Sequence, residues 1–165
     1  MQKCYNVDMG LFRKKPKHKP SLFEIENVSD FNLELREVLI FNRPVGDEKF
    51  LANLNHPQRV LALCMLLEDY GQTDTILNFF DEFPSYWDEA VKALAEVGAV
   101  KSSELIKRAI ELLPKDRILS TLDWGDLLTD EMSKIDDEFA CYPDGLLDPL
   151  HKKYAEKHRE EILNF

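Results

Sequence analysis

The longest apolar run in the sequence, "VLALCMLL", covers residues 60–67. It is too short to span a bilayer, which requires roughly 20 apolar residues. At 3.6 residues per turn, eight consecutive apolar residues cover every face of a helix, so the run predicts a helix that is buried in the middle of a domain. Asn55 or His56, followed by Pro57, is typical of a helix N-terminus, and Gly71 is predicted to end this helix.

Further helical patterns lie on both sides of this run. Ser29 or Asp30 is predicted to cap a helix over residues 31–41. Amphipathic spacing predicts further helices over residues 86–97, 102–114 and 126–142 and from about residue 148 onward, with Gly98 closing the first of these. Strand-like alternation and Asn-Gly hairpins are absent from the sequence. We therefore predict an all-α fold: a single compact domain of about six or seven helices with a central buried helix.

Charge divides the chain into two parts. Residues 1–20 contain six Lys or Arg and one Asp, with two prolines among them, which predicts a basic tail or linker. Residues 21–165 contain 15 Lys or Arg and 30 Asp or Glu, and they are predicted to form an acidic helical domain. Phosphates would be repelled by this domain, so we expect no direct binding of nucleic acid and favour a partner with a basic surface.

The cysteines and the N-terminus bear on where the protein functions. Three cysteines are scattered without a CxxC pair, which argues against a disulfide framework and a zinc site and for a reducing compartment. The N-terminus lacks the apolar core and cleavage site of a signal peptide. We therefore expect a cytoplasmic protein that has no contact with a membrane.

Residues 78–91, "NFFDEFPSYWDEAV", combine five aromatic residues with four carboxylates and no basic residue. Helical spacing predicts that the residues facing the core are Phe80, either Phe83 or Phe79, Trp87, Val91 and Leu94. The carboxylates Asp81, Glu82, Asp88 and Glu89 are then expected to face solvent. This amphipathic arrangement explains the mixture of rings and charge, but it does not explain why Lys92 is the single basic residue between residues 68 and 96.

Known catalytic signatures are missing from the sequence, which contains no GxSxG, Walker loop, GxGxxG or HExxH. His151 and His158 are seven residues apart on the last predicted helix, near Glu161, whereas metal-binding helices usually place ligands three or four residues apart. Most paired carboxylates fall on predicted helices, where a solvated face is the default. We therefore expect no enzyme activity, no metal and no cofactor.

Several blocks resemble the all-helical DNA-mimic protein family, whose domain was catalogued as one of unknown function. They are "QRVLALCMLLEDY", "NFFDEF", "AVKALAEVGAVKSSELIKRAIELLP", "IDDEF" and "LLDPLHKKYAEKHREEI", and together they span about residues 50–165. The family typically has a pair of glycines before its Gln-Phe-Phe. This chain has Gln72, Thr73, Asp74 and Thr75 there instead, so the turn that the glycines provide needs another explanation.

The resemblance implies an acidic, often dimeric protein whose carboxylates occupy the DNA-binding face of a transcription factor. A partner-binding surface is then predicted from Asp69, Asp74, Asp81, Glu82, Asp88, Glu89, Asp130, Glu131, Asp136, Asp137 and Glu138. Rows of helical carboxylates can approach the charge density of DNA and attract a basic protein. Two alternatives remain open: an immunity or regulatory protein against a basic toxin or nuclease, and, more remotely, a small carboxylate-based hydrolase.

Overall fold

The computed structural model describes residues 21–41, 48–116, 118–119 and 122–164. The predicted basic tail, residues 1–20, lies outside them. The described residues form ten α-helices and no strand. The helices are α1 Val28–Arg36, α2 Lys49–Ala52, α3 His56–Thr73, α4 Ile76–Glu82, α5 Trp87–Val97, α6 Val100–Leu112, α7 Trp124–Leu127, α8 Asp130–Ala140, α9 Asp148–Lys157 and α10 Arg159–Leu163. The all-α prediction is confirmed.

The helix count exceeds the predicted six or seven because two predicted helices are divided and two helices, α2 and α4, were not predicted. Thr129 accepts a hydrogen bond from the main-chain N–H of Met132 at 3.2 Å and so begins α8 separately from α7. His158, with φ −111° and ψ 31°, separates α9 from α10. The Thr129 side chain thus offers the backbone an alternative to continued helix, and at His158 the main chain leaves the helical region; apolar spacing reveals neither.

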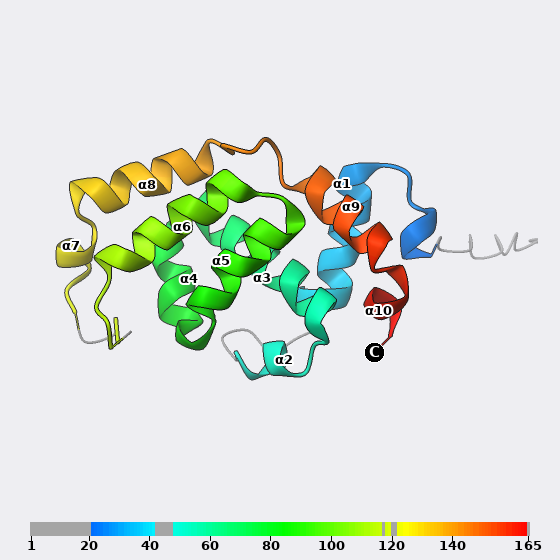
Figure 1. The fold of residues 1–165 in the computed structure, drawn as a ribbon, viewed down its shortest axis with the longest axis horizontal. Helices are drawn as coiled ribbons and strands as arrows, with labels where there is room; N and C mark the ends of the chain where they lie inside the picture. The colour runs from blue at the N-terminus through cyan, green and yellow to red at the C-terminus, as the bar shows by residue number, and fades with distance from the viewer. Residues whose placement is uncertain (1–20, 42–47, 117, 120–121, 165) are drawn as a thin grey trace, which may run out of the picture.

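Helix α3 lies near the middle of the molecule (Figure 1), with α4, α5, α6 and α8 to one side and α1, α9 and α10 to the other. Every residue from 60 to 68 is buried, which confirms the predicted central helix. Asn55 is confirmed as the N-cap: its side chain accepts from the N–H of Gln58 at 3.1 Å. None of the described helices combines the length and the apolar character that crossing a bilayer requires.

Two predicted helix ends are wrong. Helix α1 is capped by Asn27, whose side chain accepts from the N–H of Asp30, and not by Ser29 or Asp30. Gly71 does not end α3, which continues to Thr73. A Cβ at Gly71 would lie 2.7 Å from the ring of Phe139, so this glycine lets α3 and α8 pack closely. Gly98 does close α5, in the left-handed region at φ 99°.

The turn that replaces the family's paired glycines requires no glycine. Among the described non-glycine residues, Tyr142 is the one with positive φ, so none of residues 72–75 adopts the left-handed conformation that favours glycine. Asp74 ends α3 with φ −150°, and the side chain of Thr75 then accepts from the N–H of Leu77 to begin α4. A threonine cap therefore makes the turn here.

Phe79, Phe80, Phe83 and Trp87 are buried in the core, as predicted, but they come from two helices and the turn between them, and Tyr86 is partly buried. Phe83, with φ −126° and ψ 54°, ends α4, and a 3₁₀ turn, Pro84–Tyr86, leads into α5. Trp87 is 1% exposed, and its Nε1 donates to the carbonyl of Phe80 at 2.8 Å. Its ring lies edge-on to that of Phe80, with the ring centres 5.2 Å apart.

Candidate functional site

A polar pocket of about 310 Å³ lies where the C-terminal part of α3 meets α1 and the start of α9. Its lining includes three carboxylates, Glu68, Asp69 and Asp148, and one base, Arg36. Glu68 and Asp69 directly follow the buried apolar run of α3, so the helix that fills the core also carries these charges to the pocket. The carboxylates therefore outnumber the base by two.

Arg36, in the last turn of α1, holds both acidic residues of α3. Its Nη2 lies 2.7 Å from Glu68 Oε2, and its Nη1 lies 2.6 Å from Asp69 Oδ1. The Arg36 and Glu68 side chains are only 13% and 7% exposed. Because a buried charge is costly when it is left alone, this fork-shaped contact is what makes the burial of Glu68 tolerable.

Burial affects the pKa values of the pocket carboxylates more strongly than Arg36 does. Removal from water raises the pKa of Glu68, Asp69 and Asp148 above their ordinary values, although the guanidinium acts in the opposite direction. The hydroxyl of Tyr142 donates to Glu68, and burial together with Glu68 raises the pKa of Tyr142 to about 12. Tyr142 has φ 53°, a conformation that is uncommon without glycine and recurs at functional sites.

His151, one turn into α9, is fully buried beside these carboxylates. Burial lowers the pKa of its imidazole to about 3, so the ring is neutral at physiological pH. Neither ring nitrogen has a hydrogen-bond partner in the described part of the chain. Donor atoms of His151, Glu68 and Asp148 all lie within 4.8 Å of one another, which makes the three residues a set of potential metal ligands.

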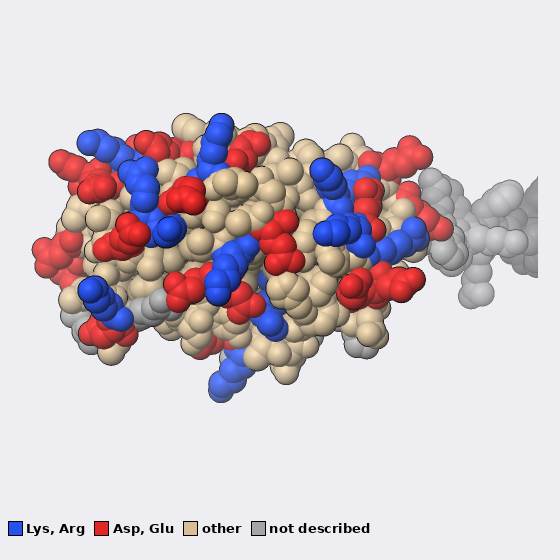
Figure 2. Space-filling view, in the orientation of Figure 1, with Lys and Arg blue, Asp and Glu red and all other residues tan. Residues whose placement is uncertain are grey.

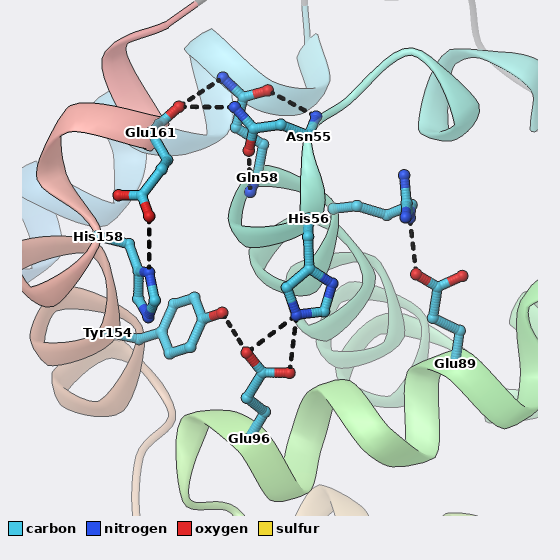
Figure 3. A network of polar contacts seen from close by, with 9 residues as sticks. Asn55, His56, Gln58, Glu89, Glu96, Tyr154, His158 and Glu161 are labelled. Carbon is cyan, nitrogen blue, oxygen red and sulfur yellow. Dashed lines mark hydrogen bonds and ion pairs between the residues drawn. The ribbon is translucent and has the colours of Figure 1, made fainter.

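A second polar network joins α3, α5 and α9 (Figure 3). Glu96 accepts from the hydroxyl of Tyr154 at 2.5 Å and lies 3.1 Å from His56 Nε2. Burial acts to raise the pKa of Glu96, but these two partners lower it below its ordinary value. His158 packs against Tyr154 with 4.5 Å between ring centres, and its Nδ1 lies 3.4 Å from Glu161. Each residue of this network contacts another one through a side chain, although His158 Nε2 is buried without a hydrogen-bond partner among the described residues. The network therefore ties α3, α5 and α9 together.

The histidine pair considered from sequence does not come together in one site. His151 turns toward Glu68 and Asp148, whereas His158 contacts Glu161 and Tyr154. Sequence reasoning missed the grouping because Arg36 and Glu68 are 32 residues apart and Asp148 is 80 residues beyond Glu68. One local signal was available: Asp148 and His151 have the i,i+3 spacing of residues on one helical face.

Most of the predicted acidic residues between 69 and 89 have partners inside the fold. Asp69 pairs with Arg36, Glu89 with Arg59 at 2.6 Å, and Glu82 accepts from the hydroxyl of Tyr70 at 2.5 Å. Asp74 accepts from the side chain of Asn78. Asp81 is partly buried and Asp88 is exposed. At least four of these six carboxylates are therefore engaged in contacts within the fold.

The second predicted block, on α8, is more open. Asp130, Glu131, Asp137 and Glu138 are exposed, while the buried face of the helix carries Met132, Ile135 and Phe139. Asp136 is partly buried and accepts from the N–H of Ile76 at 3.0 Å, and Glu138 lies 3.8 Å from Arg108. On the face shown in Figure 2, Lys and Arg side chains lie among the Asp and Glu side chains, so that face is not uniformly acidic.

These features define an all-helical, acidic protein with a polar pocket, in which Glu68 is buried, and an exposed acidic helix. The chain belongs to the DMP19-like protein family, which matches residues 52–158, well over half of its length. Glu68, Asp148, His151 and all of α8 lie within the matched range, whereas Arg36 lies before it. No curated protein and no solved structure matches the chain.

Proposed function

We propose that this chain is a protein-binding module whose acidic ridge occupies the basic DNA-binding surface of a nucleic-acid-binding protein. The acidic ridge is the outer surface of α7 and α8. Residues 122–142 contain seven Asp or Glu and one Lys, namely Asp123, Asp126, Asp130, Glu131, Asp136, Asp137, Glu138 and Lys134. Membership of the DMP19-like family and this local excess of exposed negative charge support the proposal together.

The charge spacing on α8 suits mimicry of a phosphate backbone. Five carboxylates fall within residues 130–138. At about 1.5 Å per residue, these positions span roughly 12 Å, or about one carboxylate per 2–3 Å. One strand of duplex DNA carries a phosphate about every 3.4 Å along the axis. A DNA-binding surface rich in Lys and Arg would therefore meet a similar charge density on this helix.

The ridge is a better candidate surface than the first acidic block because its charges are less engaged within the fold. Glu89 and Asp69 each pair with an arginine at 2.6 Å, whereas Glu138 has an arginine only at 3.8 Å. Asp130, Glu131 and Asp137 form no ion pair within the described residues. Unpaired charges are those that a basic partner can neutralise without breaking contacts inside this protein.

Capture from a lysate of the source cells, in low salt, tests the proposal. The bait is the full chain, and the ridge variant is Asp130→Asn, Asp137→Asn and Glu138→Gln together. The matched control removes three exposed charges from elsewhere: Glu26→Gln, Glu156→Gln and Glu160→Gln. We expect wild type and control to retain a basic DNA-binding protein that the ridge variant does not retain. Added salt should release this protein from the bait, and added duplex DNA should compete with the bait for it.

The alternatives predict different outcomes. Capture of a toxin or nuclease whose catalysis the chain blocks would favour the immunity interpretation. Turnover in a substrate panel, lost in one Asp→Asn variant, would favour the hydrolase. Equal retention by the ridge variant and the control would contradict the ridge as the binding surface. A homodimer, which the family resemblance implies, stays a prediction that sedimentation of the purified chain tests directly.

A further inference from the structure

We propose that Glu68, Asp148 and His151 bind a single divalent ion of a first-row transition metal where α3 meets α9. This site is separate from the acidic ridge and does not depend on the proposed function. Glu68 is in α3, and Asp148 and His151 share the first turn of α9. An ion held by all three would join the central helix to the C-terminal part of the fold.

His151 is the observation that points most directly to a ligand. A fully buried imidazole normally finds a hydrogen-bond partner, since an unsatisfied buried polar group is costly. Here neither ring nitrogen has a partner in the described residues, although the ring lies beside two carboxylates. A neutral imidazole has a free lone pair for a metal, and the carboxylates are placed to supply the other donors.

Asn32, on α1, is a second buried residue with a polar atom that lacks a hydrogen-bond partner among the described residues. Its side chain lines the same pocket and is 2% exposed. Its Nδ2 donates to the main-chain carbonyl of Asp148 at 3.0 Å, so the amide is fixed against the start of α9. Its Oδ1 is buried without a partner in the described residues. A second unsatisfied acceptor at the same pocket is readily explained by a cation or by water that the cation carries.

The charge balance of the pocket favours a cation over an anion. Three carboxylates and one guanidinium line it. Arg36 already contacts two of the carboxylates at 2.6–2.7 Å, so it is not available for an anionic ligand. Glu68 and Asp148, held partly out of water, would be stabilised by a positive charge placed between them.

The donor types and the surrounding contacts indicate the class of metal. One imidazole with two carboxylates suits Zn²⁺, Mn²⁺ or Fe²⁺, whereas Mg²⁺ and Ca²⁺ prefer oxygen alone. No cysteine is needed, so the scattered thiols do not argue against this site. Arg36 and the Tyr142 hydroxyl both bind the Glu68 carboxylate, as outer partners do that orient a metal ligand. The donor atoms lie within 4.8 Å of one another, and a tetrahedral ion needs roughly 3.4 Å, so small side-chain rotations would close the site.

Titration of the full, EDTA-treated chain with Zn²⁺ by calorimetry tests the proposal, with thermal unfolding measured alongside. We expect one Zn²⁺ per chain and a higher Tm, because an ion that binds the folded state stabilises it. Asp148→Asn and Glu68→Gln keep the shape of each side chain and should weaken binding by at least about tenfold. Glu156→Gln, an exposed position on the same helix as Asp148, is the matched control and should bind like wild type.

Binding that survives Asp148→Asn, or the absence of binding to the folded wild type, would overturn the proposal. A measurement on wild type alone guards against variants that fail to fold. Paramagnetic Mn²⁺ should broaden the imidazole NMR signals of His151 before those of His56 and His158, which lie in the other network. Broadening of His56 or His158 first would place the ion elsewhere and would equally overturn the proposal.

Discussion

The polar pocket and the acidic ridge are both rich in carboxylates, but they treat negative charge in opposite ways. In the pocket, Glu68 is 7% exposed and is held by a guanidinium at 2.7 Å. On the ridge, Asp130 and Asp137 point to solvent without an ion pair among the described residues. Composition counts these carboxylates alike, although those of the pocket are held by contacts inside the protein and those of the ridge are left to solvent.

This difference shows where stability and function should separate. Removing a buried partner leaves an uncompensated charge in the protein, whereas removing an exposed charge changes mainly the field that a partner experiences. Substitutions that break the buried ion pairs of the pocket should therefore lower the stability of the protein, and substitutions on the ridge should leave its stability nearly unchanged while weakening binding. The following experiments test that division, from the largest expected effect to the smallest.

Arg36→Met should lower the free energy of unfolding by about 3–5 kcal/mol, because it strands Glu68 and Asp69 in a partly buried site. The matched control is Arg108→Met. Arg108 also faces a glutamate, Glu138, but at 3.8 Å with both side chains about half exposed, so its loss should change stability by less than about 1 kcal/mol. Urea denaturation of both variants gives the comparison. Similar losses would contradict the distinction between buried and exposed pairs.

Gly71→Ala tests the contact that joins the two regions, since α3 carries the pocket and α8 carries the ridge. The new methyl group would lie 2.7 Å from the buried Phe139 ring, so overpacking should cost about 1–2 kcal/mol after the gain in helix propensity. Phe139→Leu in the same chain should recover part of the loss by making room. A Gly71→Ala variant that is more stable than wild type would show that the helices can separate freely.

Asp144→Ala should cost about 1 kcal/mol at neutral pH, because this carboxylate caps the start of α6. It accepts from the main-chain N–H groups of Lys101 and Ser102 at 3.0 and 2.7 Å. Burial opposes the effect, but these bonds lower the pKa of Asp144 below its ordinary 3.8. The stabilisation that Asp144 gives the folded protein is therefore complete at pH values above 3.8, its ordinary pKa. It is lost as the pH falls through the lower pKa that Asp144 has in the folded protein. Thermal scans from pH 7 downward should show the difference in Tm between wild type and Asp144→Ala becoming smaller. A Tm difference that stayed constant with pH would contradict this role of Asp144.

How far the sequence predicted these regions depends on the range of the interactions involved. The central helix, its Asn55 cap and the burial of Trp87 were predicted because each follows from residues close together in the chain. The pocket was not, since it depends on Arg36 and Asp148, which meet Glu68 of α3 only after folding. Helix divisions at Thr129 and His158 were also missed, because apolar spacing continues across both.

Substitutions on the ridge should have the smallest effects on stability, and the sign of the effect should depend on the position along α8. Asp130 lies in the first turn, where a negative charge is favoured by the helix dipole, so Asp130→Asn should lower stability by a few tenths of a kcal/mol. Asp137 lies in the last turn, where the dipole disfavours it, so Asp137→Asn should be neutral or slightly stabilising. Both should weaken binding of the captured partner to a similar degree and reduce its salt dependence, because the partner experiences only the lost charge. Affinity that followed the stability change of each variant would mean that folding, and not charge recognition, governs the ridge.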